Sequence, residues 1–236
     1  MATRPGINFL PGANVTLSIR DNPQASAVDV AISATGGGGS GGPGTGVPRT
    51  PPDPAAFAWA NQGAAAVTFD GVRSIITIPP ENGTQVRCLL QPLSGPAWTA
   101  VLSIDPGAPF VGSYILPGLV LFNQGTGQYC IVGGVRNSSS IVPTAYYGSS
   151  LSKYSSNLSS NTSTPIFGPF WSMVKYDGKN IAISISNTGF VWSTFYTGDL
   201  SVVGGAITHV GFGISSDGHP SNPLAAVFDS FSVSYP

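Results

Sequence analysis

Acidic side chains are the first residues to examine for chemistry, because hydrolysis of a glycosidic bond needs two carboxylates that flank the bond. The chain has nine Asp residues but a single Glu, Glu81, which lies in a turn-forming Pro-Pro-Glu-Asn-Gly segment. No two Asp residues occupy alternate positions on one strand that the sequence predicts. We therefore predict no catalytic residues and no enzymatic activity.

The two histidines, His209 and His219, are the other candidates for acid–base or metal chemistry. His209 alternates out of phase with its apolar neighbours and is expected on the polar side of a strand. His219 lies in a loop, and a site made of both histidines and Asp217 lacks the ligand spacing of a metal centre. The glycine run Gly36–Gly39 lacks the Lys-Ser/Thr pair and the helix of a phosphate loop. We predict no metal and no cofactor.

Sugar binding needs fewer specialised groups than catalysis or metal binding. An aromatic ring must face the C–H surface of the sugar, and polar side chains must bind its hydroxyl groups. Residues 137–164 are rich in Ser, Asn and Tyr, and we expect them to form the longest loop of the chain, where function usually resides. A later loop offers a similar mixture. The candidate ligand-binding residues are Tyr146, Tyr147, Tyr154, His219 and Asn222. The alternative is that the tyrosines cover hydrophobic edges or contact neighbouring subunits.

The composition limits the partners and the compartment. Only 8% of the residues are charged and the net charge is −1, so there is no basic field that would attract nucleic acid or an anionic membrane. No apolar run approaches the ~18 residues of a membrane span, and we expect no membrane insertion. The first residues lack the apolar core of a secretory signal, so an oxidising compartment is not expected. Whether Cys88 and Cys130 are bridged stays open, with two buried free thiols favoured.

The candidate residues must be positioned by short segments in which apolar and polar residues alternate, separated by Gly, Pro and Asn turns. No segment shows the sustained 3.6-residue period of a helix. This pattern predicts an all-β sandwich or jelly roll. The four tryptophans, Trp59, Trp98, Trp171 and Trp192, lie in or beside strands and are expected to pack in the core or at sheet edges. The predicted strands are Ser74–Ile78, Val86–Leu90, Trp98–Ile104, Leu116–Phe122, Tyr129–Val132, Trp171–Tyr176, Ile181–Ser186, Val191–Tyr196, Thr208–Ile214 and Ala226–Tyr235.

The N-terminal part is a separate small module. Two further strands flank an Asp-Asn-Pro turn, and two strands alone are not stable in water. Their apolar positions must therefore contact copies of the chain, another protein or the large domain. The expected domains are residues 1–35 as an anchoring β module, 36–54 as a Gly/Pro-rich tether and 55–236 as the large β domain. The candidate anchoring and oligomerisation residues are Val15, Leu17, Ile19, Val28, Val30 and Ile32.

Several segments, taken in order, resemble a known family. These are Phe57-Ala-Trp59-Ala-Asn61-Gln62-Gly63, Pro79-Pro80-Glu81-Asn82-Gly83, Arg87, Pro96-Ala-Trp98-Thr99, Ser186-Asn187-Thr188-Gly189-Phe190-Val191-Trp192, and the closing segments from His209 to Gly213 and from Phe228 to Phe231. The order is similar to that in concanavalin A-like lectin/glucanase domains of phage tail-fibre and other virion proteins. Residues 6–17 and 28–30 are similar to short β modules that precede such domains. The resemblance implies a two-sheet jelly roll, location in the virion and a homotrimer. The family usually has Asp-Gly where this chain has Thr188-Gly189, and both pairs suit a tight turn.

From the residues and the resemblance together, we expect a non-enzymatic phage virion structural protein, assembled in the host cytoplasm. In this reading, the N-terminal module attaches to the major capsid or tail protein, and the jelly roll displays a lectin-like surface to glycans, as a head fibre or capsid decoration. Two alternatives stay open. One is a tail-fibre or tail-associated receptor-binding adhesin, and the other is a capsid-stabilising cement protein without a ligand.

Overall fold

The structure is a computed structural model that describes residues 15–22, 27–34, 47–106, 115–137, 140–160, 166, 168–199, 201–203, 205–216 and 223–236. The chain divides into two compact units, Met1–Thr45 and Gly46–Pro236. In the first unit, β1 (Val15–Asn22) and β2 (Ala27–Ala34) form an antiparallel pair. The register sets Leu17 opposite Ile32 and Ile19 opposite Val30, so apolar positions of the two strands are paired with each other.

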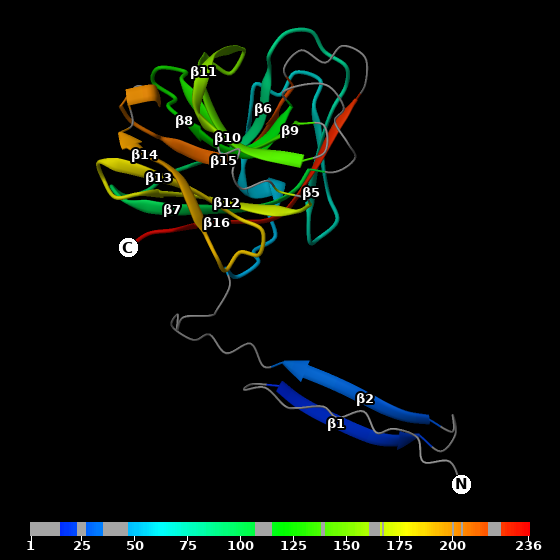
Figure 1. The fold of residues 1–236 in the computed structure, drawn as a ribbon. Helices are drawn as coiled ribbons and strands as arrows, with labels where there is room; N and C mark the ends of the chain where they lie inside the picture. Colours follow the sequence, from blue (N-terminus) through cyan, green and yellow to red (C-terminus); the bar gives the residue numbers. More distant parts are fainter. Residues whose placement is uncertain are drawn as a thin grey trace. The chain divides into compact units, whose positions relative to one another are not determined.

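The second unit is a sandwich of two seven-stranded antiparallel sheets, which confirms the predicted all-β, concanavalin A-like jelly roll (Figure 1). Sheet I contains, in spatial order, β11 (Lys153–Ser160), β10 (Ser140–Ser150), β9 (Tyr129–Asn137), β8 (Leu116–Phe122), β15 (His209–Ser215), β6 (Val86–Pro92) and β3 (Ala58–Ala60). Sheet II contains β14 (Ser193–Asp199), β13 (Asn180–Ser186), β12 (Phe170–Tyr176), β7 (Trp98–Asp105), β16 (Leu224–Ser234), β5 (Ser74–Ile78) and β4 (Ala66–Phe69). The described helices are two 3-10 turns, η1 (Pro54–Ala56) and η2 (Ser201–Val203), and neither is long enough to cross a membrane.

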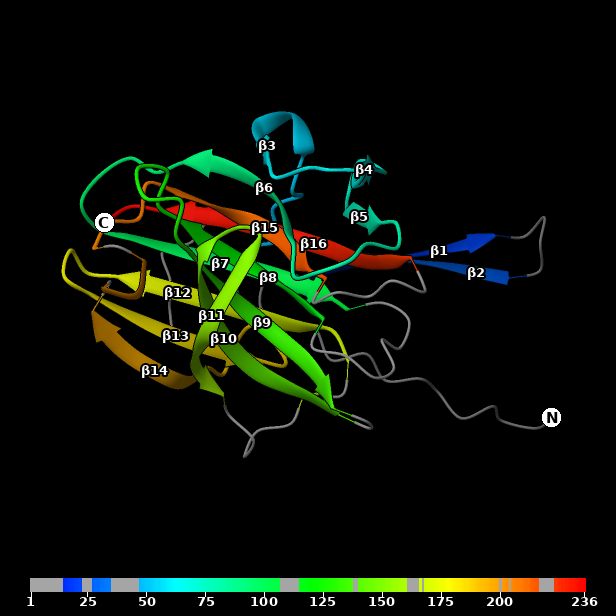
Figure 2. The same ribbon diagram turned by 90° about the horizontal axis from the view of Figure 1, so that it is seen from above.

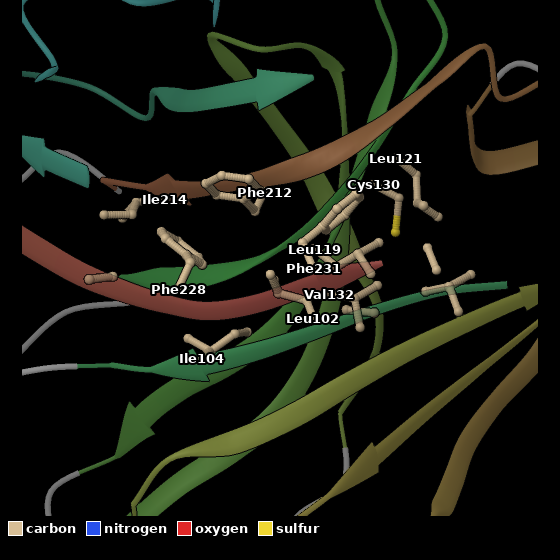
Figure 3. Close-up of a cluster of buried hydrophobic side chains, with 14 of the residues drawn as sticks. Leu102, Ile104, Leu119, Leu121, Cys130, Val132, Phe212, Ile214, Phe228 and Phe231 are labelled. Atoms are coloured by element: carbon tan, nitrogen blue, oxygen red, sulfur yellow. The ribbon is translucent and has the colours of Figure 1, made fainter. Parts of the chain in front are cut away.

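The main core fills the space between the sheets, where alternate residues of each strand point inward. Figure 3 shows side chains from both sheets that meet there. Phe212 of β15 lies 4.8 Å from Phe228 of β16, measured between ring centroids. The labelled members of this cluster are Leu102, Ile104, Leu119, Leu121, Cys130, Val132, Phe212, Ile214, Phe228 and Phe231. At about 25 cal/mol per Å² of buried apolar surface, this core is the main source of stability in the sandwich.

Sheet I also carries a second apolar cluster on its outer face, directed away from sheet II. Its buried members are Val86, Cys88, Leu90, Leu116, Val120, Tyr129, Ile131 and Tyr146. Sheet I curls over this cluster, because the turn between β10 and β11 reaches back to β6: the Val86 N–H donates to the Leu151 carbonyl at 2.7 Å. Figure 2, seen from the sheet I side, shows the β10–β11 hairpin in yellow-green in front of the sandwich. The outer face of sheet I is thus a closed second core.

Each of the ten predicted strands of the large domain has a counterpart in the structure, with bounds that differ by a few residues. The prediction of a long loop at residues 137–164 is wrong, because β10 and β11 occupy most of that segment. The Ser- and Asn-rich sequence of β11 lacks apolar alternation because β11 is an exposed edge strand. Residues 143–146 of β10 are all buried, so this part of the strand also lacks the alternation of a half-exposed strand.

The last residues of the predicted tether pack on the sandwich. The Thr50 N–H donates to Ser230 Oγ at 2.8 Å, and the Thr50 carbonyl accepts from the Phe231 N–H at 2.9 Å. The pairing of β16 shifts register between Phe228 and Ser230, so the incoming chain satisfies backbone groups that the irregular strand leaves free. Arg49 lies over the ring of Trp171, 5.9 Å from its centroid. Residues 49–50 are therefore a strap on the outer face of sheet II.

Candidate functional site

The three candidate tyrosines come together only in part. Tyr146 is 4% exposed and belongs to the second core, whereas Tyr147 packs against the main core between the sheets. Tyr154, on β11, is 43% exposed. The ring of Tyr154 meets that of Tyr146 edge to face, with centroids 5.4 Å apart and an interplanar angle of 80°. Tyr146 can therefore support a ligand-contacting ring, but Tyr154 is the one of the three that offers its own surface.

Behind Tyr146 the row continues to Tyr129, whose ring centroid lies 6.5 Å away at 78°. Tyr129 is fully buried. The three rings thus run from the second core to the surface, each edge to face with the next, which is a favourable aromatic geometry. On the outer side, the Tyr154 hydroxyl donates to Asn157 Oδ1 at 3.2 Å. The ring is braced at both ends, so its orientation is fixed before any ligand arrives.

The segment of β11 and its preceding turn that contains Tyr154 is polar and has a single charged residue. Residues 152–157 are all exposed, and Lys153 is the charged residue among them. The remaining side chains of this segment present hydroxyl and amide groups: Ser152, Ser155, Ser156 and Asn157. An exposed aromatic ring among such groups matches what a sugar needs, since the ring takes its C–H face and the polar groups take its hydroxyls.

A second cluster adjoins this surface through Ser152. Arg87 donates to Glu81 Oε2 from Nε at 3.0 Å and from a terminal nitrogen at 2.5 Å. Its other terminal nitrogen donates to the Asn61 carbonyl at 2.8 Å and to Asn61 Oδ1 at 3.0 Å. Gly63 leaves room for the guanidinium, because a Cβ there would lie 2.6 Å from Arg87 Cζ. Asn61, Gly63, Glu81 and Arg87 belong to the first three of the segments that carried the family resemblance, and the structure brings these three segments together.

The sequence reasoning did not identify this cluster as a site. Glu81 was considered only as a catalytic acid, and nothing in the spacing of Asn61, Glu81 and Arg87 shows that they meet. A usable signal was present, however. The chain has few charged residues, and its single Glu, Glu81, is followed six positions later by Arg87, close to a turn. The structure pairs the two side chains, of which 15% is exposed in Glu81 and 11% in Arg87.

The other predicted residues lie elsewhere. His219 and Asn222 fall outside the described residues, as does Asp217. His209 is half-buried at the start of β15, where its Nδ1 lies 2.9 Å from Thr208 Oγ1 and its ring faces Phe122. The anchoring positions Val15, Leu17, Ile19, Val28, Val30 and Ile32 lie on β1 and β2. Within the parts of the chain that the structure describes, no group of three or more His, Cys, Asp or Glu side chains could hold a metal ion.

Most of the described carboxylates shape turns. The Asp177 carboxylate accepts backbone N–H groups in the β12–β13 turn, and these hydrogen bonds hold its pKa below the usual value. Asp70 is held below its usual pKa in the same way, next to Arg73. Asp229, at the irregular point of β16, is different. Burial raises its pKa, and the Asp105 carboxylate raises it further, against the opposing effect of Arg49.

The two cysteines are free and buried, on opposite faces of sheet I. Cys130 faces the main core and Cys88 the second core, so no disulfide can join them. Burial raises the pKa of the Cys130 thiol to about 12 and that of Cys88 further. We therefore expect both thiols to stay protonated in the folded chain at neutral pH, as is typical of buried structural cysteines.

Comparison with known proteins shows the fold. No protein-family model and no curated protein sequence matches the chain. A functionally unknown protein from Saccharomyces cerevisiae matches with a TM-score of 0.59 and 13% identity, over 78% of this chain and 98% of that one. The GH43 protein BlXynB from Bacillus licheniformis matches with a TM-score of 0.51 and 14% identity, over 67% of this chain and 32% of that one. The carbohydrate-binding module CBM66 from Bacillus subtilis matches with a TM-score of 0.50 and 12% identity, over 80% and 100%. At these identities, the likeness is one of architecture alone.

Proposed function

We propose that the sandwich is a non-enzymatic glycan-binding domain whose contact surface is centred on Tyr154. The observation that carries the proposal is the braced ring of Tyr154, which is 43% exposed on an edge strand of hydroxyl and amide side chains. A ring that is already fixed loses little conformational entropy when a sugar stacks on it. A carbohydrate-binding module shares the fold, which is compatible with this role.

The arrangement of the carboxylates supports binding without catalysis. Retaining and inverting glycosidases place two carboxyl groups about 5–10 Å apart across the bond. The single Glu of this chain is ion-paired with Arg87. The interacting pair Asp105 and Asp229 belongs to β7 and β16 of sheet II, close to Arg49 of the strap, whereas Tyr154 lies on the outer side of sheet I. Release of reducing ends from a polysaccharide by the wild-type chain, and its loss in Asp229→Asn, would instead identify an enzyme.

The point where the chain enters the domain suits display. The strap enters on the outer face of sheet II, where Arg49 covers Trp171. Tyr154 packs on Tyr146, a member of the cluster on the outer face of sheet I. The contact surface and the attachment point of the linker are thus on opposite sides of the sandwich. A domain held from one face and open on the other can engage a ligand while it is tethered.

We further propose that residues 1–35 anchor the chain to the major capsid or tail protein of a phage virion, as a homotrimer, and that the sandwich is displayed as a head fibre or capsid decoration. The order of the motifs and the low charge support this, and the short anchor favours attachment directly on the capsid. Immunogold electron microscopy of particles with an antibody against the chain would test it. Label on the capsid shell is expected, label on the tail would favour the adhesin, and no label would remove the virion assignment.

The binding experiment uses the full chain. Affinity electrophoresis in gels that contain dextran, mannan, levan, galactan or alginate measures the retardation of wild type, Tyr154→Ala and the control Tyr235→Ala. Tyr235 is 42% exposed and lies at the C-terminal end of the chain, so it matches Tyr154 in exposure. We expect at least one polysaccharide to retard the wild type, with about tenfold weaker binding for Tyr154→Ala, since loss of an aromatic contact costs about 1.4 kcal/mol.

The Tyr235→Ala variant is expected to bind as the wild type does. If no polysaccharide retards the wild type, glycan binding is wrong and the cement role becomes the better explanation. In that case, particles that lack the protein should lose heat resistance. If both tyrosine variants bind as the wild type does, the chain binds glycans through another surface.

A further inference from the structure

The turn between β10 and β11 is held by a polar contact with two distant segments of the chain. Asn61 Nδ2 donates toward Gln85 Oε1 and the Val86 carbonyl, at 3.1 Å each, and toward the Leu151 carbonyl at 3.2 Å. Gln85 Oε1 also accepts from Ser152 Oγ at 2.9 Å. One amide group therefore joins the end of β3, the start of β6 and the turn that precedes Tyr154. We call Asn61, Gln85 and the turn residues Leu151 and Ser152 the latch.

Asn61 is fixed in an uncommon backbone conformation. Its φ is 55°, in the left-handed region, and among the described residues it is the one non-glycine residue with a positive φ. Asn adopts this conformation more readily than most residues, because its short polar side chain can hydrogen-bond locally. Arg87 holds the residue here, because the guanidinium binds both the carbonyl and the side-chain oxygen of Asn61. Those bonds also fix the side-chain amide with its nitrogen directed toward the latch.

The hairpin needs such a contact because it is weakly held on its own. β11 is the edge strand of sheet I and pairs in that sheet with β10, while Ser159 Oγ donates to the Phe195 carbonyl of β14 at 3.1 Å. The pairing with β10 shifts register at three places between Ala145 and Ser150. Each shift interrupts the ladder of hydrogen bonds. At the turn, the latch adds the Asn61 and Ser152 bonds to the backbone bond between Val86 and Leu151. Tyr154 lies two residues after Ser152, so its position depends on where the turn is held.

We infer that Asn61 and Gln85 are positioning residues for the glycan surface, which they hold in its binding geometry without contacting the sugar. This inference rests on the proposed function. The latch orders the β10–β11 hairpin, the hairpin places the Tyr154 ring against Tyr146, and the ring is then ready to stack. Loss of the latch frees the turn and lowers affinity, while the sandwich itself stays folded on its main core.

The test uses Asn61→Asp in the full chain. The new carboxylate keeps an oxygen for Arg87 and tolerates a positive φ, but it cannot donate to the three acceptors of the latch. The control is Asn123→Asp, which likewise removes a side-chain N–H donor to a backbone carbonyl, that of Val203 at 3.1 Å, and keeps the oxygen that accepts the Gly125 N–H. Both variants make the same chemical change, and each residue directly follows a strand of sheet I, Asn61 after β3 and Asn123 after β8.

Two measurements decide the outcome. Hydrogen exchange is followed by mass spectrometry in peptides that cover residues 145–160, with residues 170–186 of the β12–β13 hairpin as an internal reference. Affinity electrophoresis follows binding to the polysaccharide that retards the wild type most. For Asn61→Asp, we expect about tenfold lower protection at 145–160, an unchanged reference hairpin and about tenfold weaker retardation. Asn123→Asp should change neither the protection at 145–160 nor the retardation.

The reference hairpin separates positioning from a loss of structure, because a general loss of stability would lower protection in both hairpins. Unchanged protection at 145–160, equal loss of protection in both hairpins, or altered protection with unchanged affinity would each overturn the inference. A wild type that binds no polysaccharide would instead overturn the proposed function. The hydrogen-exchange data would then still show whether Asn61 orders the β10–β11 hairpin.

Discussion

The ion pair of Glu81 and Arg87 offers a quantitative test of how the cluster beside the latch is built. Arg87 makes four hydrogen bonds, two to the Glu81 carboxylate and two to Asn61. Replacing Arg87 by Met keeps most of the aliphatic volume but leaves the carboxylate largely buried, with Glu81 Oε1 already without a partner. Removing one member of a buried pair costs about 3–5 kcal/mol, because the remaining charge is uncompensated. The exposure of 15% places Glu81 near the lower end of this range.

A double-mutant cycle isolates the pair. Glu81→Gln alone keeps a side chain that can accept from Arg87 but leaves the guanidinium, whose side chain is 11% exposed, without its counter-charge, so we expect a loss of about 3 kcal/mol. In the double variant no buried charge remains, so its loss should fall short of the sum of the single losses by about 1–3 kcal/mol. Urea unfolding with linear extrapolation measures the three losses. Single losses that add to within 0.5 kcal/mol, or a stable Arg87→Met variant, would refute the view that this pair is desolvated and coupled.

Three further predictions concern the rest of the sandwich. Asp229→Asn should raise the melting temperature at pH 7 and leave it unchanged at pH 3. The reason is that folding raises the pKa of the Asp229 carboxyl, so the ionised form disfavours the folded state and the protonated form does not. Thermal scans that show the same change in melting temperature at pH 7 and pH 3 would contradict this. Cys88 and Cys130 should not react with a thiol reagent at pH 8 in the native chain, and both should react in urea; rapid native labelling would place a thiol at the surface. A chain that begins at residue 55 should have a free energy of unfolding about 2–4 kcal/mol lower, by urea titration, than one that begins at residue 46. The shorter chain lacks the Thr50 hydrogen bonds and leaves the buried Ser74 hydroxyl without its acceptor, the Pro52 carbonyl. Equal free energies of unfolding would show that the strap is not part of the domain.

The strands of the large domain were predictable because their apolar residues alternate. Ile181, Ile183 and Ile185 face the main core, as the period of two requires. The Asp177–Asn180 turn was also predictable from its sequence, because the Asp177 carboxylate accepts the backbone N–H groups of Lys179 and Asn180 and so closes the turn. In these segments the local sequence and the tertiary environment agree.

The β10–β11 hairpin could not be predicted, because its pattern depends on tertiary contacts. The residues of β10 near Tyr146 are buried on both faces, one against the main core and one against the second core. A strand of this kind shows no alternation. The same hairpin carries all three candidate tyrosines, so misreading it as a loop also misplaced Tyr146 as a surface residue.

The latch was equally beyond the sequence. Asn61 and Leu151 are 90 residues apart, and no local rule links a loop asparagine to the turn of a later hairpin. The positive φ of Asn61 was not visible either, although the following Gln-Gly pair marks a turn. Residue types and spacing placed Tyr154 among five candidates without separating it from Tyr146 and Tyr147, and the residues that contact it emerge only from the curling of sheet I.

The most direct test of glycan binding at Tyr154 is an NMR titration of the full chain with labelled tyrosine rings. Oligosaccharides of the polysaccharide that retards the chain are added stepwise, and the ring signals of the eight tyrosines are followed. The account predicts that the signals of Tyr154 shift most and saturate, that Tyr146 shifts less as the supporting ring, and that Tyr235 does not move. Saturating shifts at Tyr235 with none at Tyr154 would contradict it.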